Sequence, residues 1–470
     1  MSVDIVEYTL CDLADAIRAR RVSAVEVMEA TLARIDRVQP LVNAFIDIDG
    51  DGALDAARRA DAELSNGNEA PPLFGVPLAH KDLLYRKGRV STCGSEIRRN
   101  VAAEVTATAL ERLDAAGAIE VGTLNMAEFA AGGTGHNEHF GDCLNPWNTD
   151  HIPGGSSSGS GAAVAARMVT GSLGSDTGGS VRIPAGLCGV VGIKPTDGRV
   201  SRYGVMPRSW ATDTLGPMAR TARDIARMMT AIAGFDSRDP QSSSEPVPDY
   251  EEELEQTLKG LRVGVATNYY NEDIDENVAK GMAASREVFR TLGAEVVEVS
   301  VPDPGLAMRL GQLILAAEAA ALHGKWLAER PDDYQIAIRA PMEPGLFIPA
   351  TRYIEALRLR GPLLCEFLEE VLGRVDLLHV PTGPASAPTL ADSDPASPER
   401  AVRTMGLFPK FTRTISYLGL PAVSVPCGFA QNGLPVAFQL VGRPFTEARL
   451  LNAAHLYQRE TGWHERMPDL

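Results

Sequence analysis

The sequence predicts an α/β protein, because short apolar runs alternate with amphipathic helical segments. The clearest case is residues 261–266 and 294–299, two strand-like runs that flank a helical segment as in a βαβ unit. Hydrophobic residues make up 44% and charged residues 23% of the 470 residues, which is typical of a globular protein with a sizeable core. Length alone would allow two or three domains, but large α/β enzymes often form a single one.

The N-terminal region predicts three helices. Thr9 and Ser23 each stand three positions before an acidic residue, the capping-box pattern in which side chains satisfy the free N–H groups of a first helical turn. A third helix is expected over residues 54–64, ended by an Asn-Gly pair. The motifs provide no candidate catalytic side chain here. Residues 1–70 are therefore expected to form a helical layer that packs on the core or serves as a homodimer surface.

The remaining elements follow from the same rules. Strands are expected at residues 118–123, 190–194, 261–266, 294–299, 377–381, 422–426 and 436–441. Helices are expected at residues 105–116, 162–168 and 221–233 and through most of 302–373. Polar, proline-containing loops are expected at 236–250 and 383–399, and the segment 216–218 is expected to end an element.

One further apolar run, residues 74–84, predicts a buried strand that contains Lys81. Lysine is usually found at the surface. Lys81 is therefore either a side chain that extends its amine to solvent or one that the fold places inside on purpose. Local sequence leaves both alternatives open.

Charge and cysteine usage limit the class of function. The formal net charge is −16, which argues against a nucleic-acid groove or an anionic membrane surface as the main partner. The six cysteines are scattered without a C-x-x-C pair, so neither a zinc site nor a disulfide framework is indicated. No cofactor is expected. No signal-like start and no apolar run of roughly 18 residues is evident, so the protein is expected to be cytoplasmic.

Two loops rich in serine and glycine, residues 154–161 and 174–180, carry the candidate chemistry. The first contains a G-x-S-x-G match, but loop residues precede it where a nucleophile elbow needs a strand. A phosphate loop is also disfavoured, because no Lys-Ser/Thr pair follows the last glycine. The third interpretation is a serine–lysine arrangement, with Lys81 as base, a serine of the first loop as relay and Ser180 as nucleophile. Burial would lower the pKa of Lys81, as a neutral base requires.

These residues resemble the amidase signature family. The resemblance rests on Gly-Val-Pro-Leu-Ala-His-Lys-Asp at 75–82, Pro-Gly-Gly-Ser-Ser-Ser-Gly-Ser at 153–160 and Gly-Ser-Asp-Thr-Gly-Gly-Ser-Val-Arg-Ile-Pro at 174–184. It covers most of residues 70–230 and returns more weakly near 415–445. The family implies one large α/β domain, with a mixed twisted sheet covered by helices on both faces and no metal. It also implies a catalytic core at 71–235 and 411–445, and a variable, substrate-covering region at 236–410.

Roles for individual residues also follow from the resemblance. Ser180 is expected to be the acyl-enzyme nucleophile, Ser156 the relay after a cis peptide bond from Gly155, and Lys81 the base. The oxyanion hole is expected from the N–H groups of Thr177, Gly178, Gly179 and Ser180. Substrate-lining residues are expected in the loop that contains Ala130 and Gly132 and within 302–360. Supporting positions are Ser157, Asp176 and Arg182, while Ser158 replaces a glycine common in the family.

Three functions remain compatible with the sequence. The first is a stand-alone amidohydrolase for a small-molecule amide. The second is the glutaminase subunit of a tRNA-dependent amidotransferase. That relative is expected to bind the glutamine amino group through an Asp at the position of Pro409, and an expected upstream arginine is replaced near Pro341. The third is a catalytically silent binding protein on the same fold.

Overall fold

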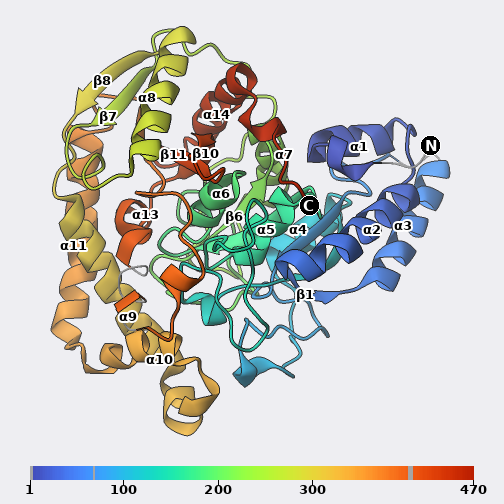
Figure 1. Ribbon diagram of the computed structural model, residues 1–470, viewed down its shortest axis with the longest axis horizontal. Coiled ribbons are helices and arrows are strands. Elements are labelled where there is room, and N and C mark those ends of the chain that lie inside the picture. Colours follow the sequence, from blue (N-terminus) through green and yellow to red (C-terminus); the bar gives the residue numbers. More distant parts are fainter. Residues whose placement is uncertain (1–3, 67–68, 398, 401–405) are drawn as a thin grey trace.

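An 11-stranded sheet runs through the whole molecule (Figure 1). The computed structural model describes residues 4–66, 69–397, 399–400 and 406–470. Strand order is β1-β3-β2-β4-β6-β5-β10-β11-β9-β7-β8, with both parallel and antiparallel pairs, which confirms the predicted α/β fold with a mixed sheet. The expected helix stop at Gly67, and Pro398 and 401–405 of the expected substrate-covering region, lie outside the described residues.

The strands are short and mostly buried. In chain order they are β1 (Phe45–Ile48), β2 (Pro77–Lys81), β3 (Ile119–Leu124), β4 (Gly171–Asp176), β5 (Val191–Lys194), β6 (Thr214–Ala219), β7 (Arg262–Ala266), β8 (Glu295–Val299), β9 (Leu377–Pro381), β10 (Ala422–Phe429) and β11 (Pro435–Val441). β2 is parallel to both of its neighbours, β3 and β4. In the middle of the sheet, each neighbouring pair in the order β4-β6-β5-β10-β11-β9 is antiparallel. The pairs β9-β7 and β7-β8 are again parallel.

β4 and β6 correct the sequence prediction, which placed a loop at 174–180 and an element end at 216–218. Both strands contain glycine where another backbone comes close. A Cβ atom on Gly174 would lie 2.7 Å from Ser157 Oγ, and one on Gly216 would lie 1.8 Å from Ile193 O. These glycines lower the apparent strand propensity of segments that the sheet holds in place. β1 was also not predicted.

Three N-terminal helices lie at the β1 end of the sheet (Figure 1). They are α1 (Leu10–Arg18), α2 (Ala24–Val42) and α3 (Gly50–Ser65). Thr9 Oγ1 accepts a hydrogen bond from Asp12 N at 3.2 Å, and Ser23 forms a complete capping box with Glu26. The helices predicted for this region are therefore confirmed, together with the side chains that start the first two.

Helices cover both faces of the sheet. One layer contains α4 (Thr108–Ala115), α7 (Ala222–Ile232), α8 (Glu276–Thr291) and α14 (Glu447–Thr461); α7 contacts α4 and α14, and α14 contacts α8. The other contains α5 (Ser158–Ala165), α6 (Arg182–Cys188) and α13 (Pro409–Leu418). α5 begins inside the first serine loop, four residues earlier than the helix predicted at 162–168. The second half of the serine loop, residues 158–161, is thus the first turn of a buried helix.

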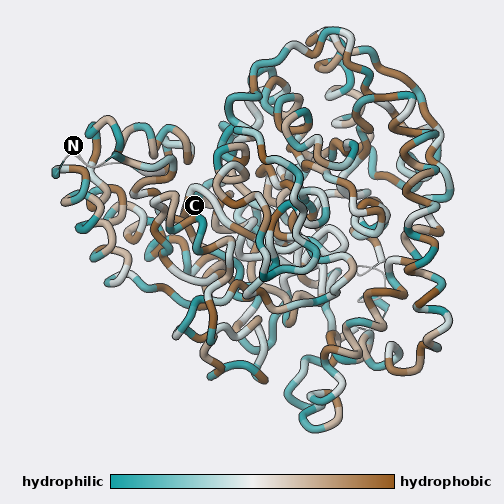
Figure 2. The backbone as a smooth tube through the Cα atoms, turned by 180° about the vertical axis from the view of Figure 1, so that it is seen from behind, coloured by the Kyte–Doolittle hydropathy of each residue, from teal (hydrophilic) through white to brown (hydrophobic). Residues whose placement is uncertain are grey.

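The segment 302–373 is helical, as predicted, and forms α9 (Pro304–Glu329), α10 (Ile336–Met342) and α11 (Ala350–Glu370). Figure 2 shows hydrophobic and hydrophilic stretches alternating along these outer helices. α9 is long and apolar enough to cross a membrane, contrary to the expectation that the chain has no such run. In the structure it packs against α11, α13 and the short helix Glu343–Phe347. α9 therefore packs against other helices of the fold, and several of its residues line the cavity over Ser180 that is described below.

Candidate active site

Lys81 lies at the end of β2 with no exposed surface. Its Nζ donates hydrogen bonds to Ser156 Oγ at 2.7 Å and to Ser175 Oγ at 2.8 Å. Burial lowers the pKa of Lys81 to about 7, although the charges of Asp213 and Asp176 oppose the shift. A large fraction of this amine is therefore neutral near pH 7, as a general base requires.

Ser175 is a contact that sequence reasoning missed. It lies in β4, which is parallel to β2, and its hydroxyl accepts a hydrogen bond from Lys81 Nζ. Alternation along β4 could have indicated it, because a strand that ends at Asp176 places neighbouring serines on alternate faces. This inference was not made because residues 174–180 were predicted to form a loop and not the end of a strand.

The first serine loop presents Ser156 through a cis peptide bond between Gly155 and Ser156, as the family resemblance implied. Ser156 is fully buried, and its carbonyl accepts a hydrogen bond from Ala127 N at 3.1 Å. Ser157 binds the backbone of Ser175 twice: its Oγ donates to Ser175 O at 3.3 Å and accepts from Ser175 N at 3.4 Å. Ser157 therefore holds the loop against β4, which agrees with a supporting position.

Ser180 follows β4 in the second loop and, unlike the residues before it, is partly exposed. Among the described residues, the N–H groups of Thr177, Gly178 and Ser180 donate no hydrogen bond. The N–H of Gly179 is already used, because it donates to Asp176 Oδ1 at 2.7 Å. Of the four N–H groups predicted for the oxyanion hole, those of Thr177, Gly178 and Ser180 are therefore free in this structure to bind a developing negative charge.

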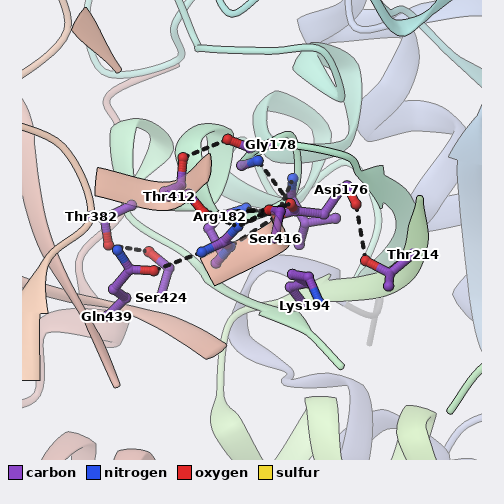
Figure 3. A network of polar contacts seen from close by, with 12 residues as sticks. Asp176, Gly178, Arg182, Lys194, Thr214, Thr382, Thr412, Ser416, Ser424 and Gln439 are labelled. Atoms are coloured by element: carbon purple, nitrogen blue, oxygen red, sulfur yellow. Dashed lines mark hydrogen bonds and ion pairs between the residues drawn. The ribbon is translucent and has the colours of Figure 1, made fainter. Parts of the chain in front are cut away.

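A buried ion pair between Arg182 and Asp176 lies next to the loop that carries Ser180 (Figure 3). Arg182 Nε donates to Asp176 Oδ2 and its Nη2 to Asp176 Oδ1, both at 3.0 Å. The same guanidinium reaches Gln439 Oε1 at 2.8 Å and Thr412 O at 3.0 Å. Burial alone would raise the pKa of Asp176, but Arg182 holds that pKa below its usual value. The ion pair of Asp176 and Arg182 therefore holds in place residues 177–180, called the donor loop from here on.

A cavity of about 580 Å³ opens over Ser180. Its lining residues are Ala130, Ala131, Gly132, Gly133, Gly155, Thr177, Gly178, Ser180, Ile183, Arg208, Met308, Gln312, Leu315, Ala316, Ala319, Ala337, Ile338, Ala340, Pro341, Met342, Gly406, Pro409 and Arg413. The structure thus brings Ala130 and Gly132 to the same space as Thr177, Gly178 and Ser180. Arg208 and Arg413 line it as well, and no motif in the sequence indicated either of them.

The described residues offer no group of three or more His, Cys, Asp or Glu side chains that could hold a metal ion. The polar groups that meet at the cavity floor are instead an amine, hydroxyls and peptide N–H groups. This set matches the needs of acyl transfer: a nucleophile, a base with a lowered pKa, and donors for an oxyanion.

Comparison with known proteins gives consistent matches over nearly the whole chain. A family model described as Amidase matches residues 26–451. The chain is 38% identical to a glutamyl-tRNA(Gln) amidotransferase subunit from Nitrosococcus oceani, covering 98% of this chain and 99% of that protein. It is 34% identical, with a TM-score of 0.90 and coverage of 97% of this chain and 99% of the other, to a chain from a vestigial protein complex that reveals the evolutionary origins of an s-triazine catabolic enzyme. The 6-aminohexanoate cyclic dimer hydrolase complexed with substrate is 27% identical, with a TM-score of 0.90 and 99% coverage of both chains.

Proposed function

Because the chain belongs to the amidase signature family, we propose that it is an amidohydrolase that cleaves a carboxamide C–N bond through an acyl-enzyme on Ser180. The observation that carries the proposal is the amine of Lys81, buried, with a pKa lowered to about 7 and 2.7 Å from Ser156 Oγ. Burial lowers that pKa because a charged amine is poorly solvated there. Ser180 and the free N–H groups of Thr177 and Gly178 line the cavity above it.

The proposed reaction has two halves. In the first, neutral Lys81 accepts the Ser156 proton while Ser156 accepts the proton of Ser180, whose Oγ attacks the amide carbon. The N–H groups of Thr177, Gly178 and Ser180 bind the carbonyl oxygen as it becomes negative. The proton then returns through Ser156 to the leaving nitrogen, the C–N bond breaks, and an ester on Ser180 remains. In the second half, water adds to this ester by the same proton route, releasing the carboxylic acid and restoring Ser180.

The first test is Ser180→Ala, assayed by the release of ammonia or amine from a panel of amides, anilides and ureas. We expect turnover to fall to background and labelling by a fluorophosphonate to disappear, while circular dichroism and the melting temperature stay close to the wild type. A Ser180→Ala variant that keeps its turnover would refute the nucleophile. A wild-type chain that hydrolyses no amide and takes no fluorophosphonate would instead support a silent binding protein.

A glutaminase role is the second candidate, favoured by 38% identity to an amidotransferase subunit over almost the full chain. Against it stands Pro409, which lines the cavity where an acidic residue would be needed for an amino group. No Asp or Glu occurs among the other cavity-lining residues. Glutamine hydrolysis by the isolated chain, or only with a co-purified second subunit, would support this candidate. Hydrolysis of other amides by the chain alone supports the first.

A further inference from the structure

Two arginine side chains in the cavity, Arg208 and Arg413, have no hydrogen-bond or ion-pair partner among the residues that the structure describes. We propose that they bind a carboxylate carried by the substrate, so that the enzyme hydrolyses amides with a second, anionic end. This inference rests on the proposed amidohydrolase function and names the class of substrate for the same site.

Neither guanidinium makes a hydrogen bond or an ion pair with any described residue. The residues that the structure does not describe, 1–3, 67–68, 398 and 401–405, include no Asp or Glu, so none of them could supply a carboxylate side chain to either arginine. Arg208 Nη1 and Arg413 Nε are closed off from solvent and still lack an acceptor. A buried charge without a partner is unfavourable, and proteins normally pair it. Arg182, which is also buried, shows the usual solution, since Asp176 binds it twice.

Their position is next to the reacting groups. A Cβ atom built on Gly178 would lie 3.2 Å from Arg413 Nε and 3.6 Å from its Nη2. Arg413 on α13 therefore stands beside the donor loop. Arg208 reaches the same cavity from the segment between β5 and β6, where its backbone N–H donates to Asp213 Oδ2 at 2.7 Å. An acidic group of a substrate whose amide lies over Ser180 would meet these two side chains.

Both arginines remain charged at neutral pH. Burial lowers the pKa of Arg208 to about 10, Asp213 opposes this shift, and the positive charge of Arg413 adds to it. Burial likewise lowers the pKa of Arg413 to about 10. The two cations line one cavity, and the charge of Arg413 disfavours the charged form of Arg208. An anion bound between them would relieve both the lack of a partner and this repulsion.

The rest of the cavity explains why the anion would be a carboxylate on an otherwise apolar molecule. Apart from the two arginines, Gln312 and the groups around Ser180, the lining consists of alanine, glycine, proline and larger apolar side chains. The lining carries two positive charges and no negative one, in a chain of net charge −16. Guanidinium groups bind carboxylates through paired, charge-assisted hydrogen bonds. A cationic substrate would find no counter-charge there.

The kinetic test compares three amides of equal length whose far end differs in charge: ω-carboxy amides, n-alkyl amides and ω-amino amides, each with two to five methylenes. We expect kcat/KM to be highest for the carboxylates and lowest for the amines. Arg413→Gln and Arg208→Gln should each lower kcat/KM for the carboxylate by roughly 10- to 100-fold, the usual loss for a charged hydrogen bond. The alkyl amide should change by less than about threefold. Arg413→Lys should restore part of the loss.

Arg309→Gln is the matched control, because this exposed arginine lies on α9 beside the cavity-lining Met308 but does not line the cavity itself. It should leave all three substrates unchanged. Equal kcat/KM for carboxylate and alkyl amides, with no loss in either cavity variant, would overturn the proposed carboxylate site. That result would leave the hydrolase function standing.

A binding test needs no turnover. In the Ser180→Ala background, glutarate and pentanoate should raise the melting temperature in a concentration-dependent way, while 1-pentanol should not. Inorganic phosphate is tested in the same way as a second kind of anion. A larger shift with phosphate than with glutarate would show a phosphate site and reject the carboxylate. Absence of any shift up to tens of millimolar would also reject it. A shift by glutarate in a chain that hydrolyses no amide would support the anion site and refute the hydrolase instead.

Discussion

Two buried lysines show that the partners of an amine, and not burial alone, decide its role. Lys194 is as buried as Lys81, but its Nζ donates to Asp197 Oδ1 at 3.1 Å and to the carbonyls of Pro195 and Leu420. Lys81 contacts only two hydroxyls, and no described carboxylate forms an ion pair with it. A neutral amine surrounded by hydroxyls can accept a proton, whereas one held by a carboxylate and two carbonyls is occupied as a donor.

The first residue-scale prediction is a pH profile. If Lys81 is the base, log(kcat/KM) should rise with a slope of about one as the pH increases through roughly 7, because the protonated amine that prevails below its pKa cannot accept a proton. Lys81→Ala should lose at least about 100-fold in kcat/KM, the usual contribution of a general base. Stopped-time assays from pH 5 to 10 on an uncharged amide measure the profile. A flat profile across this range would contradict the assignment.

The second prediction concerns Ser175, a positioning residue for Lys81. Its hydroxyl accepts a hydrogen bond from the amine, which favours the charged form, so Ser175→Ala should lower the pKa of Lys81 further. The limb of the pH profile should then move to lower pH, with a loss of roughly 2- to 10-fold in kcat at its plateau. Ser172→Ala is the control, since this buried serine of β4 donates to Leu173 O within its own strand. A limb that stays in place would refute the role of Ser175.

At the scale of elements, β4, the donor loop and α6 form one continuous unit. β4 ends at Asp176, α6 begins at Arg182, and the intervening turn carries Ser180. Gly179 makes the turn with a φ of +129° and packs against Thr412 on α13. The helix after Ser180 and the strand before it are thus joined by a turn that only glycine fits well.

Two glycine substitutions should distinguish an effect on the conformation of the turn at Gly179 from a general effect on the stability of the protein. In Gly179→Ala the new Cβ atom would lie 2.2 Å from Thr412 Oγ1, so the turn must shift. We expect a drop in kcat of at least about tenfold, as for a displaced oxyanion donor, and a lower melting temperature. Gly324→Ala in α9, where a Cβ atom has no neighbour within 4 Å, should instead stabilise the protein by about 0.5–1 kcal/mol with unchanged kcat. Equal kcat in both variants would contradict the turn's role.

The sequence predicted elements well where packing is periodic and less well where backbones approach closely. Capped helices such as α2 and the parallel pair of β7 and β8 carry regular apolar spacing, and both were predicted. β4 and β6 contain glycine and proline and are held by neighbouring strands, so local preference failed. The motif residues around Lys81 and Ser180 were found from their pattern. Arg208, Ser175 and Arg413 belong to no motif, because only the folded chain brings them to the site.

At the scale of the whole molecule, Arg182 joins two distant parts of the chain. It binds Asp176 beside the nucleophile loop, Thr412 and Ser416 on α13, and Gln439 on β11 (Figure 3). The two stretches that carry the family resemblance, 70–230 and 415–445, therefore meet at one guanidinium. Through α13 the same contact fixes the helix that carries Arg413. The ion pair thus links the turn that carries Ser180, the sheet and the proposed anion site.

Loss of this link should be measurable as a pH-dependent loss of stability. Arg182→Met leaves the Asp176 carboxylate buried without its cation and should cost about 3–5 kcal/mol at pH 7. Because Arg182 lowers the pKa of Asp176, its stabilising contribution is complete above the unfolded pKa of about 4 and is lost as the pH falls through the lower folded value. In Arg182→Met the carboxyl can take a proton instead, so the gap between the urea midpoints of wild type and variant should narrow from pH 7 to pH 4. The double variant Asp176→Asn/Arg182→Met should recover much of the midpoint at pH 7, since the amide oxygen can still accept from Gly179 N. A gap that is the same at both pH values, or a double variant less stable than Arg182→Met, would show that packing and not charge holds these parts of the chain together.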